Sequence, residues 1–267
     1  MSEDEIRTRV ALADWKEHRF FGHAVFAELV GNTSLTALYS LAVTGRMPQK
    51  ETVRVLDEMA ATLTVADPRI WPLKVSRIAA CLGQPILGWC FGALSQDRAL
   101  IGADVPREAA KWLQRYAAAR AAGESRESLL RTVIGDRNYL VGFGVPVRSI
   151  DERVECLKKR LRILRRDDLP HWCSFMEVAE AIRDRPRMVP NIAGACAAIL
   201  LDCGYSPLEV GNLVPVLPQH TFVANAVEAS TQRSHLLLRL PLKDVSYEGP
   251  SARKSPLRLR HEKGFKD

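Results

Sequence analysis

Apolar residues recur along most of this chain at the spacing of an α-helix. In the segment 51–63 they form one continuous face, made by Val53, Leu56, Met59, Ala60 and Leu63. The same pattern predicts further helices over 105–122, after Glu124-Ser125, and over 151–166, 171–183, 191–203, 207–216 and 219–231. No β-rich section and no internal repeat interrupts this pattern. The predicted fold class is therefore all-α.

Two segments depart from the amphipathic pattern. The segment 73–95 is rich in alanine and glycine and carries charge only at Lys74 and Arg77. A helix that is apolar on all sides is usually buried, so we expect a buried central helix pair or one long interrupted helix here. The segment 241–267 is polar and punctuated by prolines, and we expect it to be irregular.

Several residues mark the ends of the predicted helices. Gly45 precedes Met47-Pro48 and suits the left-handed position that follows a helix. Asp151 is suited to cap a helix that runs to about Arg166. That helix has acidic residues at its start and basic residues at its end, as the helix dipole favours.

The composition is that of an ordinary globular protein. The chain has 267 residues, of which 47% are hydrophobic, and this length fits one large domain or two unequal lobes. No apolar run approaches the roughly 18–20 residues that span a bilayer. The N-terminus is acidic and lacks the features of a signal peptide. We therefore expect a cytoplasmic protein that does not enter the membrane.

The six cysteines are scattered and include no pair at metal-ligand spacing, so we expect reduced structural thiols and no metal site. The net charge of +7 favours anionic partners. Much of the excess lies in 158–166 and in the tail from Arg253 to Lys266. These runs are either a solvated helix face and a disordered tail or an anion-binding surface. We do not expect nucleic-acid binding, because no such motif accompanies them and aromatic residues are few.

Four segments in order, with a closing tetrapeptide, resemble the citrate synthase superfamily, including its compact citryl-CoA lyase type. The run Gly142-Phe-Gly-Val-Pro146, followed by Asp151-Glu-Arg153, is similar to the family signature Gly-Phe-Gly-His-Pro…Asp-Pro-Arg. The other matches are 29–48, which contains Thr44-Gly-Arg-Met-Pro48; 73–104; 189–228, which begins Val189-Pro-Asn-Ile-Ala-Gly194; and Tyr247-Glu-Gly-Pro250. Together they span nearly the whole chain.

The resemblance implies a helical fold with a large and a small lobe and an active site in the cleft between them. The range 1–267 would be a single citrate synthase-like unit. The small lobe, approximately 105–205, would be inserted between parts of the large lobe, and 250–267 would be a basic, flexible tail. The resemblance also implies a homodimer. The family's reaction joins an acyl-CoA to a 2-oxo acid or reverses that step. The resemblance therefore implies a CoA thioester as a substrate and no covalently bound cofactor.

Three positions of the resemblance depart from the family pattern. Leu100 and Val145 stand where the family has catalytic histidines, and Ala193 stands where it has a catalytic aspartate. The family's reaction needs a base to remove a carbon-bound proton and donors to stabilise the enolate oxygen. Aliphatic side chains supply neither. The ordinary citrate synthase mechanism is therefore not expected.

Other residues near these positions could bind anions. Arg153 matches the arginine that holds a substrate carboxylate in the family, although it could instead be a surface arginine at a helix start. Arg69 could bind an anion or belong to an ordinary helix-start loop, and Asn191 could contact substrate or only cap a helix. The resemblance assigns Arg137, Arg148, Gly142 and Gly144 to the loop region that binds CoA. The alternative for the two arginines is a solvated surface. The run Gly142-Phe-Gly144 is too short to be a phosphate-binding loop by itself.

Two residues are candidates for a rebuilt acid–base function. Asp104 stands at the end of the segment that replaces the family's His-Gly-Gly-Ala-Asn, and we favour a helix cap near Pro106 over a base. His220 lies close to the position of a substrate-binding arginine in the family, and we favour a capping or core histidine over an acid–base group.

Three functions remain open at this point. The first is a citrate synthase-like enzyme, an acyltransferase or lyase, that handles a CoA thioester or oxo-acid ligand by rebuilt chemistry. The second is a pseudoenzyme that binds a small anionic ligand or associates with an intact homologue without turnover. A nucleic-acid-associated protein that uses the basic helix and tail is a third and weaker alternative.

Overall fold

The computed structural model describes residues 6–65, 67–99, 101–135, 139–145, 149–185, 187–232, 242–244, 246–251 and 253. Contacts between residues divide the chain into two units, Met1–Arg233 and Ser234–Asp267. In the second unit, a short 3-10 helix, η4 (Leu242–Asp244), precedes a turn in which the Tyr247 hydroxyl donates to the carbonyl of Pro250. Most of the predicted basic tail, 250–267, lies outside the described residues.

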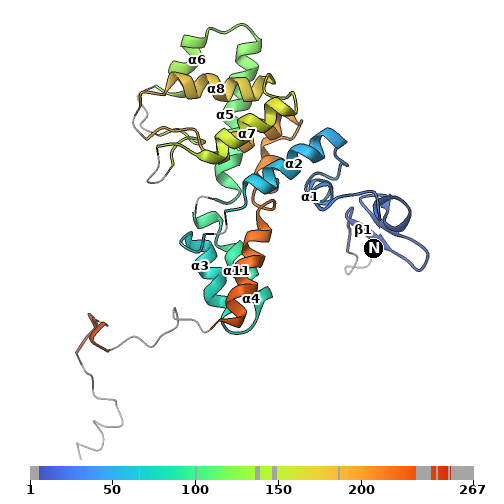
Figure 1. Cartoon of the computed structure of the whole chain (residues 1–267), viewed down its shortest axis with the longest axis vertical. Coiled ribbons are helices and arrows are strands. Elements are labelled where there is room, and N and C mark those ends of the chain that lie inside the picture. The colour runs from blue at the N-terminus through green and yellow to red at the C-terminus, as the bar shows by residue number, and fades with distance from the viewer. Residues whose placement is uncertain are drawn as a thin grey trace, which may run out of the picture. The chain divides into compact units, whose positions relative to one another are not determined.

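The first unit begins with a small antiparallel sheet in the order β1-β2-β3 (Figure 1). Its strands are β1 (Ala11–Ala13), β2 (His18–Phe20) and β3 (His23–Ala24), and a π-helix, η1 (Val25–Leu29), follows. Ala11 pairs with Phe20, and Arg19 pairs with Ala24. The hydrophobic pattern does not reveal this sheet, because strands of two or three residues are too short to show alternation.

The remainder of the first unit is helical, which confirms the all-α class. The observed helices lie within a few residues of the predicted ones, and 73–95 is a pair of helices rather than one. The helices are α1 (Leu35–Thr44), α2 (Lys50–Thr62), α3 (Trp71–Ala80), α4 (Pro85–Leu94), η2 (Asp97–Ala99), α5 (Asp104–Ala121), α6 (Arg126–Val133), α7 (Glu152–Ile163), α8 (Pro170–Ala181), α9 (Ile192–Asp202), α10 (Pro207–Leu213) and α11 (Gln219–Thr231).

The predicted helix boundaries have the expected local causes. Gly45 follows α1 with φ +69°, a conformation that glycine adopts without strain. The Asp151 side chain caps α7, and the Asn191 side chain caps α9 by accepting from the backbone N–H of Gly194. Ser206 and Glu209 form a reciprocal capping box at the start of α10. The cap predictions for Gly45, Asp151 and Asn191 are therefore confirmed.

Helix α9 lies at the centre of the main core. Every residue from Gly194 to Leu201 is buried, and the helix contacts α5, α7, α8 and α10. Small side chains such as Ala195 and Ala198 let these neighbours approach closely from several sides. The apolar sequence of α9 therefore has a direct structural cause, because every face of the helix packs against protein.

Helices α3, α4 and α11 pack side by side as a second group (Figure 1). Helix α4 meets the other two through Gly88 and Gly92, where an added Cβ would lie within 2.7 Å of atoms of α3 or α11. Its larger side chains point the other way: Ile86 and Leu94 are 71% and 77% exposed. The expectation that 73–95 is buried is therefore wrong for α4 in the single chain, because the glycine face is the one that packs.

No helix in the described ranges is long and apolar enough to cross a membrane. The proposed lobe boundary at about 105–205 stays a prediction. Within it, α5, α8 and α9 contact one another, and α10, which follows it, also packs on α5 and α9.

The aromatic side chains of the main core permit a test of its packing. Phe175 is fully buried, with ring centroids 5.2 Å from Phe143 and 6.0 Å from Trp172. Phe175→Ala should lower the free energy of unfolding by about 3–5 kcal/mol, because it leaves a cavity that the neighbours fill only partly. Urea denaturation followed by circular dichroism measures the change. The exposed Ile163→Ala control should stay within about 0.5 kcal/mol of the original protein.

Candidate functional site

The loop 142–145 is hydrogen-bonded to the segment that enters α9. The Gly144 N–H donates to the carbonyl of Val189 at 2.7 Å, and the Asn191 N–H donates to the carbonyl of Gly142 at 3.1 Å. The Asn191 side-chain amide donates to the carbonyl of Gly144 at 3.1 Å. These bonds join two segments about 45 residues apart in sequence, which carry Val145 and Ala193.

Two glycines allow this close approach. Gly142 has φ +93°, and a Cβ on it would lie 3.1 Å from the Cα of Gly194. A Cβ on Gly194 would lie 2.5 Å from the carbonyl oxygen of Gly142. Glycine at both positions therefore has a packing reason that does not involve a phosphate group. A contribution of Gly142 and Gly144 to CoA binding stays a prediction.

A buried carboxylate, Asp151, holds the same framework from the other side. Its side chain is inaccessible to solvent and accepts four hydrogen bonds. Three come from Arg153: its backbone N–H at 3.2 Å, and Nε and Nη2 at 2.8 Å each. The fourth comes from the backbone N–H of Ile192 at 2.9 Å. Asp151 thus links the start of α7 to the start of α9.

This pairing changes what Arg153 offers to a ligand. The Nε–Nη2 edge, which would grip a carboxylate in two-point fashion, already grips Asp151. Nη1 has no hydrogen-bond partner among the described residues, and the side chain is 27% exposed. The sequence pattern indicates Asp151 as a helix cap and does not indicate that it is the partner of Arg153. The sequence feature that could have indicated this ion pair is the spacing of two residues between the acidic Asp151 and the basic Arg153.

Two of the three aliphatic positions, Val145 and Ala193, lie within the described residues, and their correspondence to catalytic positions stays a prediction. Val145 and Ala193 are both half-buried, on the two segments that the hydrogen bonds join. Neither has an atom that can donate or accept a proton. Leu100, Arg137 and Arg148 lie outside the described residues.

Asn191 is engaged at both ends of its amide. Its oxygen accepts from the N–H of Gly194 at 3.1 Å, and its nitrogen donates to Gly144. This geometry accounts for the residue structurally. Substrate binding by Asn191 stays a prediction.

His220 and Arg69 both adjoin the connection between α2 and α3. Nε2 of His220, in the first turn of α11, is 2.7 Å from the hydroxyl oxygen of Thr64. Arg69 donates through Nε and Nη2 to Asp67, and this hydrogen bonding raises the pKa of the guanidinium. His220 is exposed, so it is neither a core histidine nor the side-chain cap of α11. Both of those favoured interpretations are wrong, because the exposed imidazole is hydrogen-bonded to the Thr64 hydroxyl between α2 and α3.

Asp104 does not cap a helix. It is the first residue of α5, and its exposed carboxylate forms an ion pair with Arg107 one turn later. The N–H of Ala103 is instead accepted by Asp97 at 3.0 Å. The predicted cap is therefore wrong. A capping residue directly precedes the first residue of its helix, and here that residue is Ala103, because Asp104 is already the first residue of α5.

The basic helix α7 is partly neutralised within the chain. Arg160 forms an ion pair with Glu58 of α2, and Arg162 lies 3.5 Å from Asp167. Just after the helix, Arg166 donates to the backbone carbonyl of Asp202. These pairs favour a structural reading for part of the run 158–166. Phosphate binding by its remaining cations stays a prediction.

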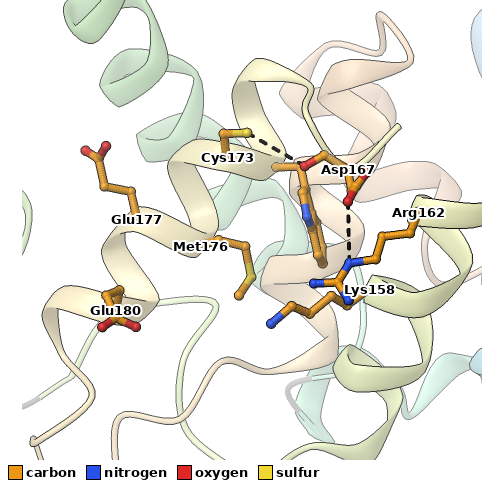
Figure 2. A pocket seen from close by; sticks show the side chains of 8 residues that line it. Lys158, Arg162, Asp167, Cys173, Met176, Glu177 and Glu180 are labelled. Atoms are coloured by element: carbon orange, nitrogen blue, oxygen red, sulfur yellow. Dashed lines mark hydrogen bonds and ion pairs between the residues drawn. The ribbon is translucent and has the colours of Figure 1, made fainter. Parts of the chain in front are cut away.

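Two hollows on the described residues lie away from the predicted site. One has a volume of about 400 Å³ and lies between α7 and α8. Figure 2 shows Lys158 and Arg162 on one side of it and Met176, Glu177 and Glu180 on the other. The second has a volume of about 340 Å³ and lies where α8, α9 and α10 meet. Neither is lined by any residue of 142–153 or 191–193.

The described cysteines and acidic residues provide no metal site. No group of three or more His, Cys, Asp and Glu side chains in the described ranges is arranged to hold a metal ion. Cys196, in α9 near Arg153, is fully buried, and burial raises the pKa of its thiol to about 12. This thiol therefore stays protonated and is a poor nucleophile at neutral pH.

Three solved structures resemble this chain. Citryl-CoA lyase from Hydrogenobacter thermophilus has a TM-score of 0.78 and 22% identity over 96% of this chain and 99% of its own. The ATP citrate lyase D541A mutant from Methanosaeta concilii, in complex with (3S)-citryl-CoA, has a TM-score of 0.69 and 16% identity over 94% of this chain and 43% of its own. Citrate synthase from the archaeon Thermoplasma acidophilum has a TM-score of 0.57 and 16% identity over 83% of this chain and 58% of its own.

The chain has the citrate synthase fold. No protein-family model matches the sequence, and no curated protein matches it. At 22% identity or less, these likenesses establish the fold and not the reaction. The shared fold agrees with the resemblance that the sequence 142–146 indicates.

The glycine contact between the loop and α9 yields a second prediction. Gly194→Ala would bring a methyl group 2.5 Å from the carbonyl oxygen of Gly142 and 2.7 Å from the ring of Phe175. It should lower the free energy of unfolding by about 1–3 kcal/mol and move the backbone amide NMR signals of Phe143 and Gly144. Ala193→Ser, on the same helical turn, should cost less than about 1 kcal/mol. Equal effects of the two variants would contradict the tight loop–helix contact.

Proposed function

We propose that this protein binds a CoA thioester, an oxo acid or a tricarboxylate at the junction of the loop 142–145 and α9. If it turns these ligands over, it does so by chemistry that differs from that of citrate synthase. One observation carries the proposal: the hydrogen-bonded framework around Val145 and Ala193 is intact, although both residues are aliphatic. A framework of this kind can still position a ligand when the catalytic groups are absent.

The proposed contacts with the ligand follow from charge and hydrogen-bonding capacity. Arg153 would bind a carboxylate through Nη1, since its other edge holds Asp151. Arg69 and Asn191 are the other proposed substrate contacts. Arg137, Arg148, Gly142 and Gly144 are the proposed contacts with CoA. Any bond-making or bond-breaking step would need a proton acceptor from outside the loop, and His220 is the proposed candidate.

A second candidate function is that of a pseudoenzyme. The observation that favours it is the combination of aliphatic side chains at Val145 and Ala193 with an arginine fork that is already occupied by Asp151. Asp104, which might have served as a base, is exposed and paired with Arg107. Such a protein would bind a ligand, or associate with an intact homologue, without turnover.

Ligand-induced stabilisation separates these possibilities. Thermal unfolding should be measured with CoA, acetyl-CoA, citrate and oxaloacetate in turn. A ligand at about 100 times its Kd should stabilise the protein by about 2.7 kcal/mol. Arg153→Ala should remove the stabilisation by oxaloacetate, which carries no hydroxyl group in its oxo form, but keep the stabilisation by CoA. Arg162→Ala, an exposed arginine of α7, is the matched control and should keep both.

The outcomes of this experiment have distinct meanings. No stabilisation by any of the four compounds would contradict the enzyme and the ligand-binding form of the pseudoenzyme, and would leave only association with an intact homologue. Unchanged stabilisation by oxaloacetate in Arg153→Ala would remove Arg153 from the site. Release of free CoA thiol from acetyl-CoA and oxaloacetate would favour the enzyme, whereas stabilisation without thiol release would favour the pseudoenzyme.

We further propose that the protein acts as a homodimer that buries the outer face of α4. Gly88 and Gly92 pack inward, whereas Ile86, Phe91 and Leu94 face solvent in the single chain. Val223 and Val227 of the neighbouring α11 are also exposed. Large apolar side chains exposed on two adjacent helices are typical of a protein–protein contact.

The dimer proposal is tested by the mass of the protein in solution. Sedimentation equilibrium should give twice the mass of one chain. Phe91→Glu should give the mass of a single chain with an unchanged circular dichroism spectrum, because a charge cannot be buried unpaired in an apolar contact. Leu208→Glu, at a comparably exposed position of α10, should leave the dimer intact. A monomeric original protein, or a dimeric Phe91→Glu variant, would oppose the proposal.

A further inference from the structure

We propose that the hollow where α8, α9 and α10 meet is a binding site for a small hydroxycarboxylate, separate from the site at the loop 142–145. The hollow has a volume of about 340 Å³, which is large enough for a molecule of this class. Its polar lining comes from Arg46, Gln114, His171, Tyr205, Ser206 and Glu209. None of these residues is among the proposed contacts of the first site.

The first element of the site is an oriented imidazole. Nδ1 of His171 lies 2.8 Å from Oδ1 of Asp202, whose side chain is 3% exposed. Asp202 also accepts the backbone N–H groups of His171 at 2.9 Å and Trp172 at 2.8 Å, so its position is set independently of the imidazole. An ionised carboxylate only accepts hydrogen bonds, and it therefore places the proton of neutral His171 on Nδ1.

This arrangement leaves Nε2 of His171 as a hydrogen-bond acceptor. Among the described residues, no donor reaches Nε2, although His171 lines the hollow. Its side chain is 23% exposed. A fixed acceptor at the wall of a polar hollow is suited to a hydroxyl group that donates to it.

The second element of the site is a guanidinium with free hydrogen-bonding capacity. Arg46 follows α1 and forms an ion pair with Glu209 through Nη2 at 2.9 Å, while its side chain is 62% exposed. Burial raises the pKa of Glu209. Hydrogen bonds from the Ser206 N–H and hydroxyl and from Arg46 lower it and together outweigh the effect of burial, so the pKa lies below its usual value. Glu209 is therefore charged at neutral pH and holds Arg46 at the hollow. The guanidinium has five N–H donors, and the remaining ones can bind a carboxylate.

The two elements together define the class of ligand. A carboxylate would pair with Arg46, and a hydroxyl would donate to Nε2 of His171. A ligand with a carboxylate alone would leave the imidazole unused, and one with a hydroxyl alone would leave the guanidinium unused. A hydroxycarboxylate satisfies both groups.

Binding is tested with L-malate and succinate, which carry the same two carboxylates but differ in the hydroxyl group. The probe is the imidazole NMR signal of His171 in the full-length protein. Malate should move this signal in a saturable way, and succinate should bind about tenfold more weakly for want of one hydrogen bond. Arg46→Gln should weaken malate binding about tenfold or more. His171→Gln assigns the signal.

His18→Gln is the matched control, because this exposed histidine lies in strand β2 and belongs to neither proposed site. It should leave malate binding at His171 unchanged. The proposal is overturned by the absence of a saturable shift at His171, by equal affinities for malate and succinate, or by unchanged binding in Arg46→Gln. Because the readout is specific to His171, failure here is distinct from failure of ligand binding at Arg153.

Discussion

The buried carboxylate of Asp151 is the interaction on which the arrangement of the candidate site depends. It receives hydrogen bonds from Arg153 at the start of α7 and from Ile192 at the start of α9, and solvent does not reach it. A buried charge is tolerated only when paired and hydrogen-bonded, so these two helix starts are held in one geometry. The cost of this arrangement is that Arg153 has half of its guanidinium already engaged.

The contact between Gly142 and Gly194 completes the same framework. It lets a loop and a helix meet at a distance that any side chain would prevent. Asn191 then ties the loop to the helix start from both ends of its amide. Backbone geometry and a buried ion pair thus fix the loop against the start of α9, whereas the side chains of Val145 and Ala193 carry no group that transfers a proton.

Helices α9 and α4 show that similar apolar sequences can have different surroundings. Both are short, rich in small residues and without charge in their central turns. Helix α9 is enclosed because α5, α7, α8 and α10 all pack on it. Among the described residues, helix α4 packs on α3 and α11 through its glycine side, and large side chains such as Ile86 and Leu94 remain exposed within the single chain. Hydrophobicity predicts that such a surface will be covered, but not by which partner.

Local sequence was enough to predict the helices, the caps at Asp151 and Asn191, and the absence of proton-transfer groups at Val145 and Ala193. These properties depend on neighbouring residues or on side-chain chemistry, which folding does not alter. The missed N-terminal sheet, the wrongly predicted cap at Asp104 and the exposed position of His220 depend on surroundings that a local pattern lacks. The contacts of Asp151 with Ile192 and of Asp202 with His171 depend on how the helices pack, and no local pattern predicts them. Pairs separated by tens of residues meet only where the packing of helices brings them together.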